Sequence, residues 1–207
     1  MFGLNPIETL DGIAEKIAPG RTPAYTSAQV LKAIELISGS GVGRQQLAGR
    51  LGIGEGSART MVKHLSAEGL IVTTREGMML TEKGIRLLDE LHKQISFAEL
   101  TNTGVTVGMS DYAVLVRGVI DCVRFGVEQR DSAFIAGAKG ATTLVFDGMR
   151  FHIPGMDIVP QPELGDELIG KFKPEVGDVV IIGTADNLLF AEIGAKSSAL
   201  ELLRMCK

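Results

Sequence analysis

The apolar residues in the first half of the chain recur at helical spacing in three successive segments. The first predicted helix starts at the capping hydroxyl of Thr26 or Ser27 and ends in the glycine-rich stretch 38–43. A second, short helix is predicted over Arg44–Leu51 and a third over Glu55–Glu68, with a glycine-containing turn between them. The pattern therefore predicts three short helices in a row.

The third predicted helix is strongly two-faced. At 100° per residue its apolar positions form one stripe, made of Ala58, Met61, Val62 and Leu65. The opposite face carries small residues, hydroxyls and cations, namely Gly56, Arg59, Thr60, Lys63 and Ala67, with Ser57 and His64 on its flank. A helix that enters a DNA major groove needs such a face, because small residues allow close approach and arginine can bind guanine with two hydrogen bonds.

A β-hairpin and a fourth helix follow the third helix. Residues 70–74 read as a strand, Arg75–Gly77 as a turn, and residues 78–80 as the returning strand. The last helix is predicted from Thr81 to about Ile95. The order is therefore helix, helix, turn, helix, hairpin and helix.

This order, carried by QLAGRLGIGEGSARTMVKHLSAEGLI and by LTEKG after the hairpin, resembles the winged helix-turn-helix family of prokaryotic regulators. Domains of that family place the third helix in the major groove of double-stranded DNA and the wing on the backbone or minor groove. The resemblance implies contacts on the third helix, in the wing and, through the helix N-terminus, at the start of the second helix. The candidate DNA-binding residues are Arg44, Gln45, Ser57, Arg59, Thr60, Lys63, His64 and Arg75.

The charge distribution is compatible with this expectation. The chain has a net charge of −4, but residues 21–95 hold ten Lys or Arg against seven Asp or Glu, whereas residues 96–207 hold ten against fifteen. Charges are screened beyond about 10 Å at 0.1 M salt, so an acidic second half does not prevent DNA binding by the first.

The reading face is nevertheless only modestly basic, because Arg59 and Lys63 are its two cations. A single copy should bind weakly, so a homodimer is expected. The apolar residues Leu88, Leu91 and Ile95 offer a dimer seam on the fourth helix; alternatively they pack within the domain.

The second half of the chain shows mixed periodicity. After an N-terminal extension (1–24) and the winged helix-turn-helix (25–95), residues 96–207 are expected to form an α+β domain that senses an effector or dimerises. The expected order is a linker at 96–102, strands at 103–109 and 112–116, a helix at 125–138, a hairpin of 141–146 and 149–153, a helix at 163–172, a strand at 179–182 and a helix within 185–205. This order predicts a two-layer α+β sandwich with a mostly antiparallel sheet.

The stretch LVRGVIDCVRFGVEQRDSAFIAGAKGATTLVFDG gives the whole chain a resemblance to a group of archaeal winged-helix proteins whose C-terminal half is a domain of unknown function. That half is also similar to a small α+β domain inserted in some tRNA-charging enzymes. The resemblance implies no catalytic residues, and fold alone is a poor guide to function.

Catalytic and cofactor motifs were sought in the second half. Its glycines fit neither a dinucleotide-binding nor a P-loop pattern, and neither a serine elbow nor an HExxH motif occurs. No enzyme activity, cofactor or metal is therefore expected. A charged cluster either covers a solvated face or, if its arginines converge near Gly137 and Gly140, forms a pocket for a small anionic effector. Its members are Arg117, Arg124, Glu128, Arg130 and Asp131.

The remaining signals concern location. Cys122 and Cys206 form no metal-binding or CxxC spacing, so both are expected to be reduced and simply packed. The chain lacks an apolar run of about 20 residues and a signal-peptide pattern, so a cytoplasmic protein without membrane contact is expected.

The leading interpretation is a DNA-binding transcriptional regulator. One alternative is an enzyme fused to a winged helix, as in archaeal riboflavin kinases, whose nucleotide signature is not visible here. The other is an RNA- or translation-linked protein-interaction module.

Overall fold

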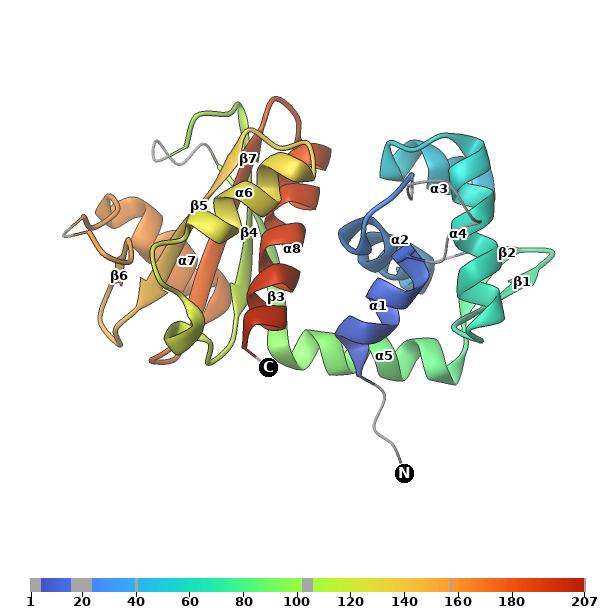
Figure 1. The fold of residues 1–207 in the computed structure, drawn as a ribbon, viewed down its shortest axis with the longest axis horizontal. Helices are drawn as coiled ribbons and strands as arrows, with labels where there is room; N and C mark the ends of the chain where they lie inside the picture. The colour runs from blue at the N-terminus through green and yellow to red at the C-terminus, as the bar shows by residue number, and fades with distance from the viewer. Residues whose placement is uncertain (1–4, 16–23, 40, 102–105, 157, 207) are drawn as a thin grey trace. The chain divides into compact units, whose positions relative to one another are not determined.

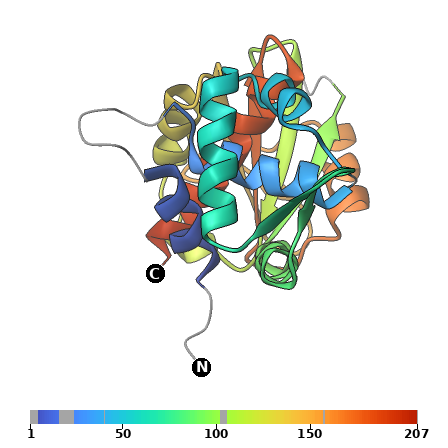
Figure 2. The same cartoon turned by 90° about the vertical axis from the view of Figure 1, so that its right-hand side faces the viewer.

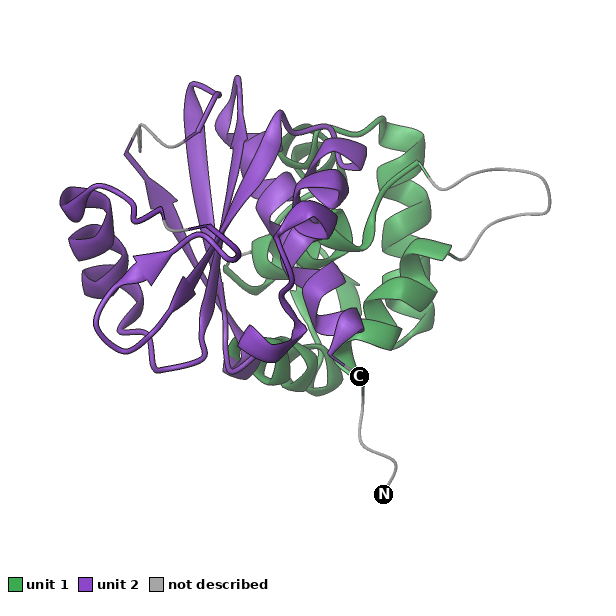
Figure 3. Ribbon diagram, turned by 60° about the vertical axis from the view of Figure 1, so that its left-hand side comes forward, with its two compact units in different colours: residues 1–92 green, residues 93–207 purple. Residues whose placement is uncertain are grey.

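The computed structural model describes residues 5–15, 24–39, 41–101, 106–156 and 158–206. The chain divides into two compact units, residues 1–92 and 93–207 (Figure 3). The elements of each unit are labelled in Figure 1. Within the described residues, no helix is both long and apolar enough to cross a membrane.

Unit 1 contains the predicted helices and hairpin. Its elements are α1 (Pro6–Glu15), α2 (Ser27–Gly39), α3 (Arg44–Leu51), α4 (Glu55–Ala67), β1 (Ile71–Thr74), β2 (Gly77–Leu80) and the start of α5 (Glu82–Gln94). The α1 helix lies in the segment expected to be an extension, and its side chains Leu10 and Ile13 are fully buried. It is tied to α2 by the Ser27 hydroxyl, which donates to the Asp11 carboxylate at 2.7 Å.

Local capping explains where α2 and α5 begin. The Thr26 N–H donates to the Gln29 side-chain oxygen at 2.9 Å, while the Gln29 N–H donates to the Thr26 hydroxyl at 3.3 Å, a reciprocal cap. At α5 the Thr81 hydroxyl accepts from the Gly84 N–H at 3.1 Å and donates to the Gly69 carbonyl at 2.6 Å. The same threonine therefore starts α5 and fastens it to the end of α4.

Unit 2 is built, within the described residues, on a five-stranded antiparallel sheet of order β3-β4-β7-β5-β6. The strands are β3 (Ile95–Leu100), β4 (Ser110–Val116), β5 (Gly140–Phe146), β6 (Phe151–His152) and β7 (Val179–Ala185). The helices are η1 (Ile120–Cys122), α6 (Val127–Ile135), α7 (Pro162–Phe172) and α8 (Leu188–Met205). The predicted α+β class and antiparallel sheet are confirmed.

Helices cover both faces of this sheet (Figure 3). The α7 helix packs Leu168 and Phe172 against Leu144, Leu115 and other buried side chains of one face. The α8 helix contacts β4 and β7, and α6 contacts β5 and α8, on the opposite face. The expected two layers thus correspond to the sheet with α6 and α8, and α7 adds a helix on the other side.

The first strand of unit 2 was misplaced by sequence reasoning. The segment 96–102, expected to be a linker, forms most of β3, which pairs with β4 from Ile95 to Leu100. Of the expected strand 103–109, residues 103–105 lie outside the described part, and residues 106–109 form bends before β4. The prediction is wrong for 106–109 because β4 is already paired on both sides, with β3 and β7, which leaves these residues no neighbouring strand.

Two further expectations are corrected. Cys122 and Cys206 are not simply packed thiols but form a disulfide between η1 and the end of α8, with Cα atoms 5.5 Å apart. Tertiary folding brings them together, so local spacing carried no sign of it. The proposed dimer seam is also wrong, because Leu88, Leu91 and Ile95 are all buried within the single chain.

Candidate nucleic-acid interface

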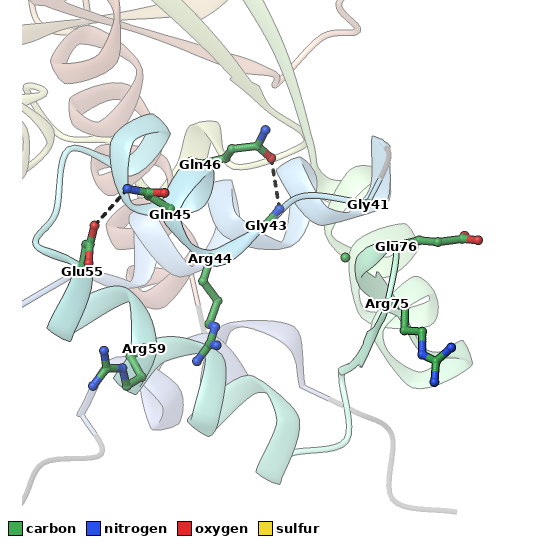
Figure 4. A pocket seen from close by; sticks show the side chains of 10 residues that line it. Gly41, Gly43, Arg44, Gln45, Gln46, Glu55, Arg59, Arg75 and Glu76 are labelled. Atoms are coloured by element: carbon green, nitrogen blue, oxygen red, sulfur yellow. Dashed lines mark hydrogen bonds between the residues drawn. The ribbon is translucent and has the colours of Figure 1, made fainter.

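A hollow of about 810 Å³ lies where α3, α4 and the hairpin meet (Figure 4). The N-terminal residues of α3, the first turns of α4 and the hairpin turn all border it. The lining residues are Gly41, Gly43, Arg44, Gln45, Gln46, Glu55, Arg59, Arg75, Glu76 and Gly77. The structure thus brings together four of the candidate DNA-binding residues, Arg44, Gln45, Arg59 and Arg75.

The α3 helix presents its positive end to this hollow. Its N-cap is Gly43, which has no side chain to accept from the first-turn N–H groups, and its own N–H donates to Gln46 Oε1 at 3.1 Å. Arg44 is the first residue of the helix and is exposed. A free helix N-terminus beside a guanidinium is suited to bind a phosphate group.

The α4 helix, drawn in teal in Figure 2, has the predicted division of faces. Its apolar stripe is buried and consists of Ala58, Met61, Val62 and Leu65. Arg59, Thr60 and Lys63 are exposed, and the Thr60 hydroxyl donates back to the Gly56 carbonyl at 3.0 Å. The exposed face therefore carries the two cations in a position to meet a groove.

The residues on the flank of α4 are less accessible to DNA than those on its exposed face. Ser57 is half-buried. The His64 ring is also half-buried, and its Nδ1 lies 3.0 Å from the hydroxyl of Tyr25. Burial raises the pKa of the Tyr25 hydroxyl. His64 is thus engaged inside unit 1, and this contact gives it a structural role beside any role at a ligand.

The hairpin is clamped to the loop before α3. The Met78 N–H donates to the Val42 carbonyl at 3.2 Å, forming an isolated bridge. Beside it the backbones of Gly41 and Gly77 are in such close approach that a Cβ on either glycine would overlap the opposite backbone. Gly77 also has a φ of 126°, which disfavours other residues. These glycines were not predicted as site residues, because only the tertiary contact gives them this role.

Three arginines from three different elements extend from the hollow on the same side. Figure 4 shows Arg44 of α3 between Arg59 of α4 and Arg75 of the hairpin turn. The acids that border the same hollow are turned away from this side: Glu55 accepts a hydrogen bond from Gln45 at 3.4 Å, and Glu76 extends outward from the hairpin. The arrangement places positive charge where separate phosphates or base edges of one duplex can be reached.

The charged cluster expected in unit 2 does not converge. Arg117 follows the end of β4 that pairs with Val179, whereas Gly140 pairs with Thr184 at the other end of β7. Arg117 instead bonds Asp178 at 3.3 Å, and Arg130 bonds Asp131 at 3.1 Å.

The other members of that cluster do not change this result. Arg124 is exposed and Glu128 is half-buried at the start of α6. The pocket that would require Arg117, Arg124 and Arg130 to meet near Gly137 and Gly140 is therefore not formed.

The fold and this surface define the class of protein: a winged helix-turn-helix joined to a separate antiparallel α+β unit. A family model described as "CggR N-terminal DNA binding domain" matches residues 26–95. A second model, described as "Domain of unknown function (DUF4443)", matches residues 107–202. None of the curated proteins compared matches the chain.

A solved structure extends this assignment to nearly the whole chain. It is a hypothetical protein from Pyrococcus horikoshii OT3, with 30% sequence identity and a TM-score of 0.68. The similarity covers 88% of this chain and 93% of that chain. This chain therefore belongs to the same family as that protein, and it combines a CggR-like N-terminal DNA-binding domain with a C-terminal DUF4443 domain.

Proposed function

We propose that this protein is a cytoplasmic transcriptional regulator that binds double-stranded DNA as two copies, without catalytic activity. The convergence of Arg44, Arg59 and Arg75 on one side of unit 1 carries the proposal. Unit 2 would dimerise or sense a small ligand. The match of residues 26–95 to a DNA-binding domain family supports the DNA-binding part.

Each cation has a distinct role in this proposal. Arg59 lies on the exposed face of α4 and would read a guanine edge in the major groove. Arg44, at the α3 N-terminus, and Lys63, further along α4, would bind phosphates on either side of the groove. Arg75 at the hairpin turn would bind the backbone or enter the minor groove.

The test is a mobility-shift assay on genomic fragments that flank the gene, at two salt concentrations. Lys63→Ala should weaken binding to all fragments alike, whereas Arg59→Ala should also reduce the preference among them by about fivefold or more, because a two-bond contact to guanine contributes about 1–3 kcal/mol of discrimination. Absence of any shift by the wild-type protein at low salt would refute the proposal. Equal effects of both changes on preference would refute the assignment of Arg59 as the reading residue.

A further inference from the structure

Among the described residues of unit 2, a group of large apolar side chains stands exposed at one end of the sheet. We name this surface the apolar end; it consists of Val107, Met109, Phe134, Ile135 and Phe190. Ile135 is 87% exposed and Val107 78%. Scattered exposed apolar residues are ordinary, but a group gathered on one surface of a folded domain marks an interaction site.

Backbone hydrogen bonds place the segments that carry these residues at the same end of the sheet. The Met109 N–H donates to the Ala185 carbonyl at 2.9 Å, and the Lys139 N–H donates to the Thr184 carbonyl at 2.8 Å. The loop that carries Met109 and the segment that follows α6 are therefore hydrogen-bonded to two adjacent residues at the end of β7. Asp186 follows directly, and Phe190 lies in the first turn of α8.

Two glycines hold the aromatic rings in place. An ideal Cβ on Gly137 would lie 3.3 Å from the Phe190 ring, and one on Gly140 would lie 3.6 Å from the Phe134 ring. Both glycines have positive φ, 91° and 146°. Both rings therefore lie against backbone that carries no side chain.

The rim of the apolar end carries paired charges of both signs. Lys139 Nζ bonds Asp186 at 2.5 Å, and Arg130 bonds Asp131 at 3.1 Å. All four side chains are substantially exposed. An apolar centre with a polar rim is the usual composition of a protein–protein interface, and the balance of signs gives a polyanion such as DNA no preference for it.

We propose that the apolar end binds the apolar end of a second copy of this chain. A twofold axis brings the same patch of both copies together, so each cation of the rim can face the anion of the other copy. A rim of neighbouring opposite charges is complementary to itself under that operation, whereas a strongly charged partner would meet repulsion from half of it. The proposed function enters only as the reason for two copies, because the apolar end would hold together the two copies that bind one DNA duplex.

The first test is the molar mass of the full chain in solution, measured by light scattering over a range of micromolar concentrations. The wild-type protein should be a dimer. Ile135→Lys should weaken association by at least about a hundredfold, because it buries one lysine of each copy in an apolar contact. A lysine in the last turn of α6 suits the helix dipole, so the fold should be retained.

Val176→Lys is the matched control. Val176 is 73% exposed and precedes β7 at the end of that strand opposite to the apolar end. The control should associate like the wild type. A monomeric wild type, or equal dissociation by the two lysine variants, would overturn the proposal.

A charge exchange tests specifically for a second copy. Lys139→Asp alone gives the rim a net negative charge, and Asp186→Lys alone gives it a net positive charge, so each variant should self-associate less than the wild type at low salt. A mixture of the two should regain association, because opposite rims then face each other. A mixture that associates no better than either variant alone would overturn the twofold arrangement.

The outcome separates this proposal from the proposed function. The mobility-shift assay with Ile135→Lys uses an intact unit 1. DNA binding that depends on Arg59 in a wild-type protein that stays monomeric would retain the DNA-binding role, but it would reject both the two-copy form of binding and the apolar end as a dimer surface. A dimer disrupted by Ile135→Lys but without DNA binding would do the reverse.

Discussion

Replacement of Arg75 by alanine gives a quantitative test of the DNA-binding surface. Arg75 is exposed at the hairpin turn and borders the hollow with Arg44 and Arg59. If it neutralises a phosphate, it releases counterions on binding, and its loss must reduce the salt dependence of the binding constant. Loss of affinity alone would not show this, because a distorted hairpin would also weaken binding.

The expected magnitude follows from the number of phosphate contacts. With Arg44, Lys63 and Arg75 on phosphates, the slope of log K against log salt is about −2.7 for one copy and about −5.4 for two copies, at about 0.9 per contact. Removal of Arg75 leaves about −1.8 or about −3.6. The slope should thus lose one third of its value in either case.

Fluorescence anisotropy of a labelled duplex over a series of salt concentrations measures this slope directly. Arg86→Ala is the matched control, since Arg86 is an exposed arginine on α5, lies 3.7 Å from Glu82 and does not line the hollow. The control should keep the wild-type slope. An unchanged slope in Arg75→Ala, or an equal fall in both variants, would show that the hairpin turn is not a phosphate contact.

Three further predictions concern stability, measured by denaturant unfolding. Gly77→Ala should lower the free energy of unfolding by about 1–3 kcal/mol, because its Cβ would overlap the Gly41 backbone and its φ is unfavourable for alanine; little change would refute the clamp. Replacing Cys122 and Cys206 by serine should lower it by about 4–5 kcal/mol, because the disulfide joins residues separated by 84 positions in the sequence; a much smaller loss at equal fold would contradict the pairing. Burial raises the pKa of the Tyr25 hydroxyl, so the unfolded chain loses this proton at lower pH than the folded chain. The free energy of unfolding of the wild type should therefore fall as the pH rises above about 10, and it should fall less steeply in Tyr25→Phe. Identical slopes of the two proteins at alkaline pH would refute this.

Sequence periodicity was sufficient for α2 to α5 and the hairpin of unit 1, because these elements are determined locally, whereas α1 lies in the segment expected to be an extension. The predicted range Arg44–Leu51 is the observed α3, and the stripe Ala58, Met61, Val62 and Leu65 is the buried face of α4. A helix whose buried and exposed sides differ this strongly can be recognised from spacing alone. The exposed cations then follow by elimination.

Features that depend on contacts between distant segments were not predicted. The β3 strand has no distinctive alternation, and its identity follows only from its pairing with β4. The Cys122–Cys206 disulfide and the Gly41–Gly77 contact likewise join residues whose local sequence gives no sign of a partner. The expected arginine pocket failed for the same reason, since sequence proximity does not determine which end of a sheet a residue occupies.

The turn of the β5–β6 hairpin shows the opposite case. The Asp147 carboxylate accepts from the Met149 N–H at 2.8 Å and the Arg150 N–H at 2.9 Å. The hydrogen bonds from Arg150 and then Met149 lower the pKa of that carboxyl. The side chain of the turn residue Asp147 thus provides the hydrogen bonds that the backbone N–H groups of the turn need. The Asp-Gly pair between two apolar runs was therefore enough to predict the hairpin.

The clamp between Gly41 and Gly77 determines how a small number of cations can form a DNA-binding surface. Because it fixes the hairpin against the loop that starts α3, the separation of Arg75 from Arg44 is determined before DNA is bound. Little ordering of the backbone then opposes binding, so more of each charge contact appears as affinity. A rigid arrangement also leaves little room to adjust these cations within one copy. We therefore expect regulation of DNA affinity to act on the association of two copies, which multiplies the number of contacts, rather than on the geometry of the surface itself.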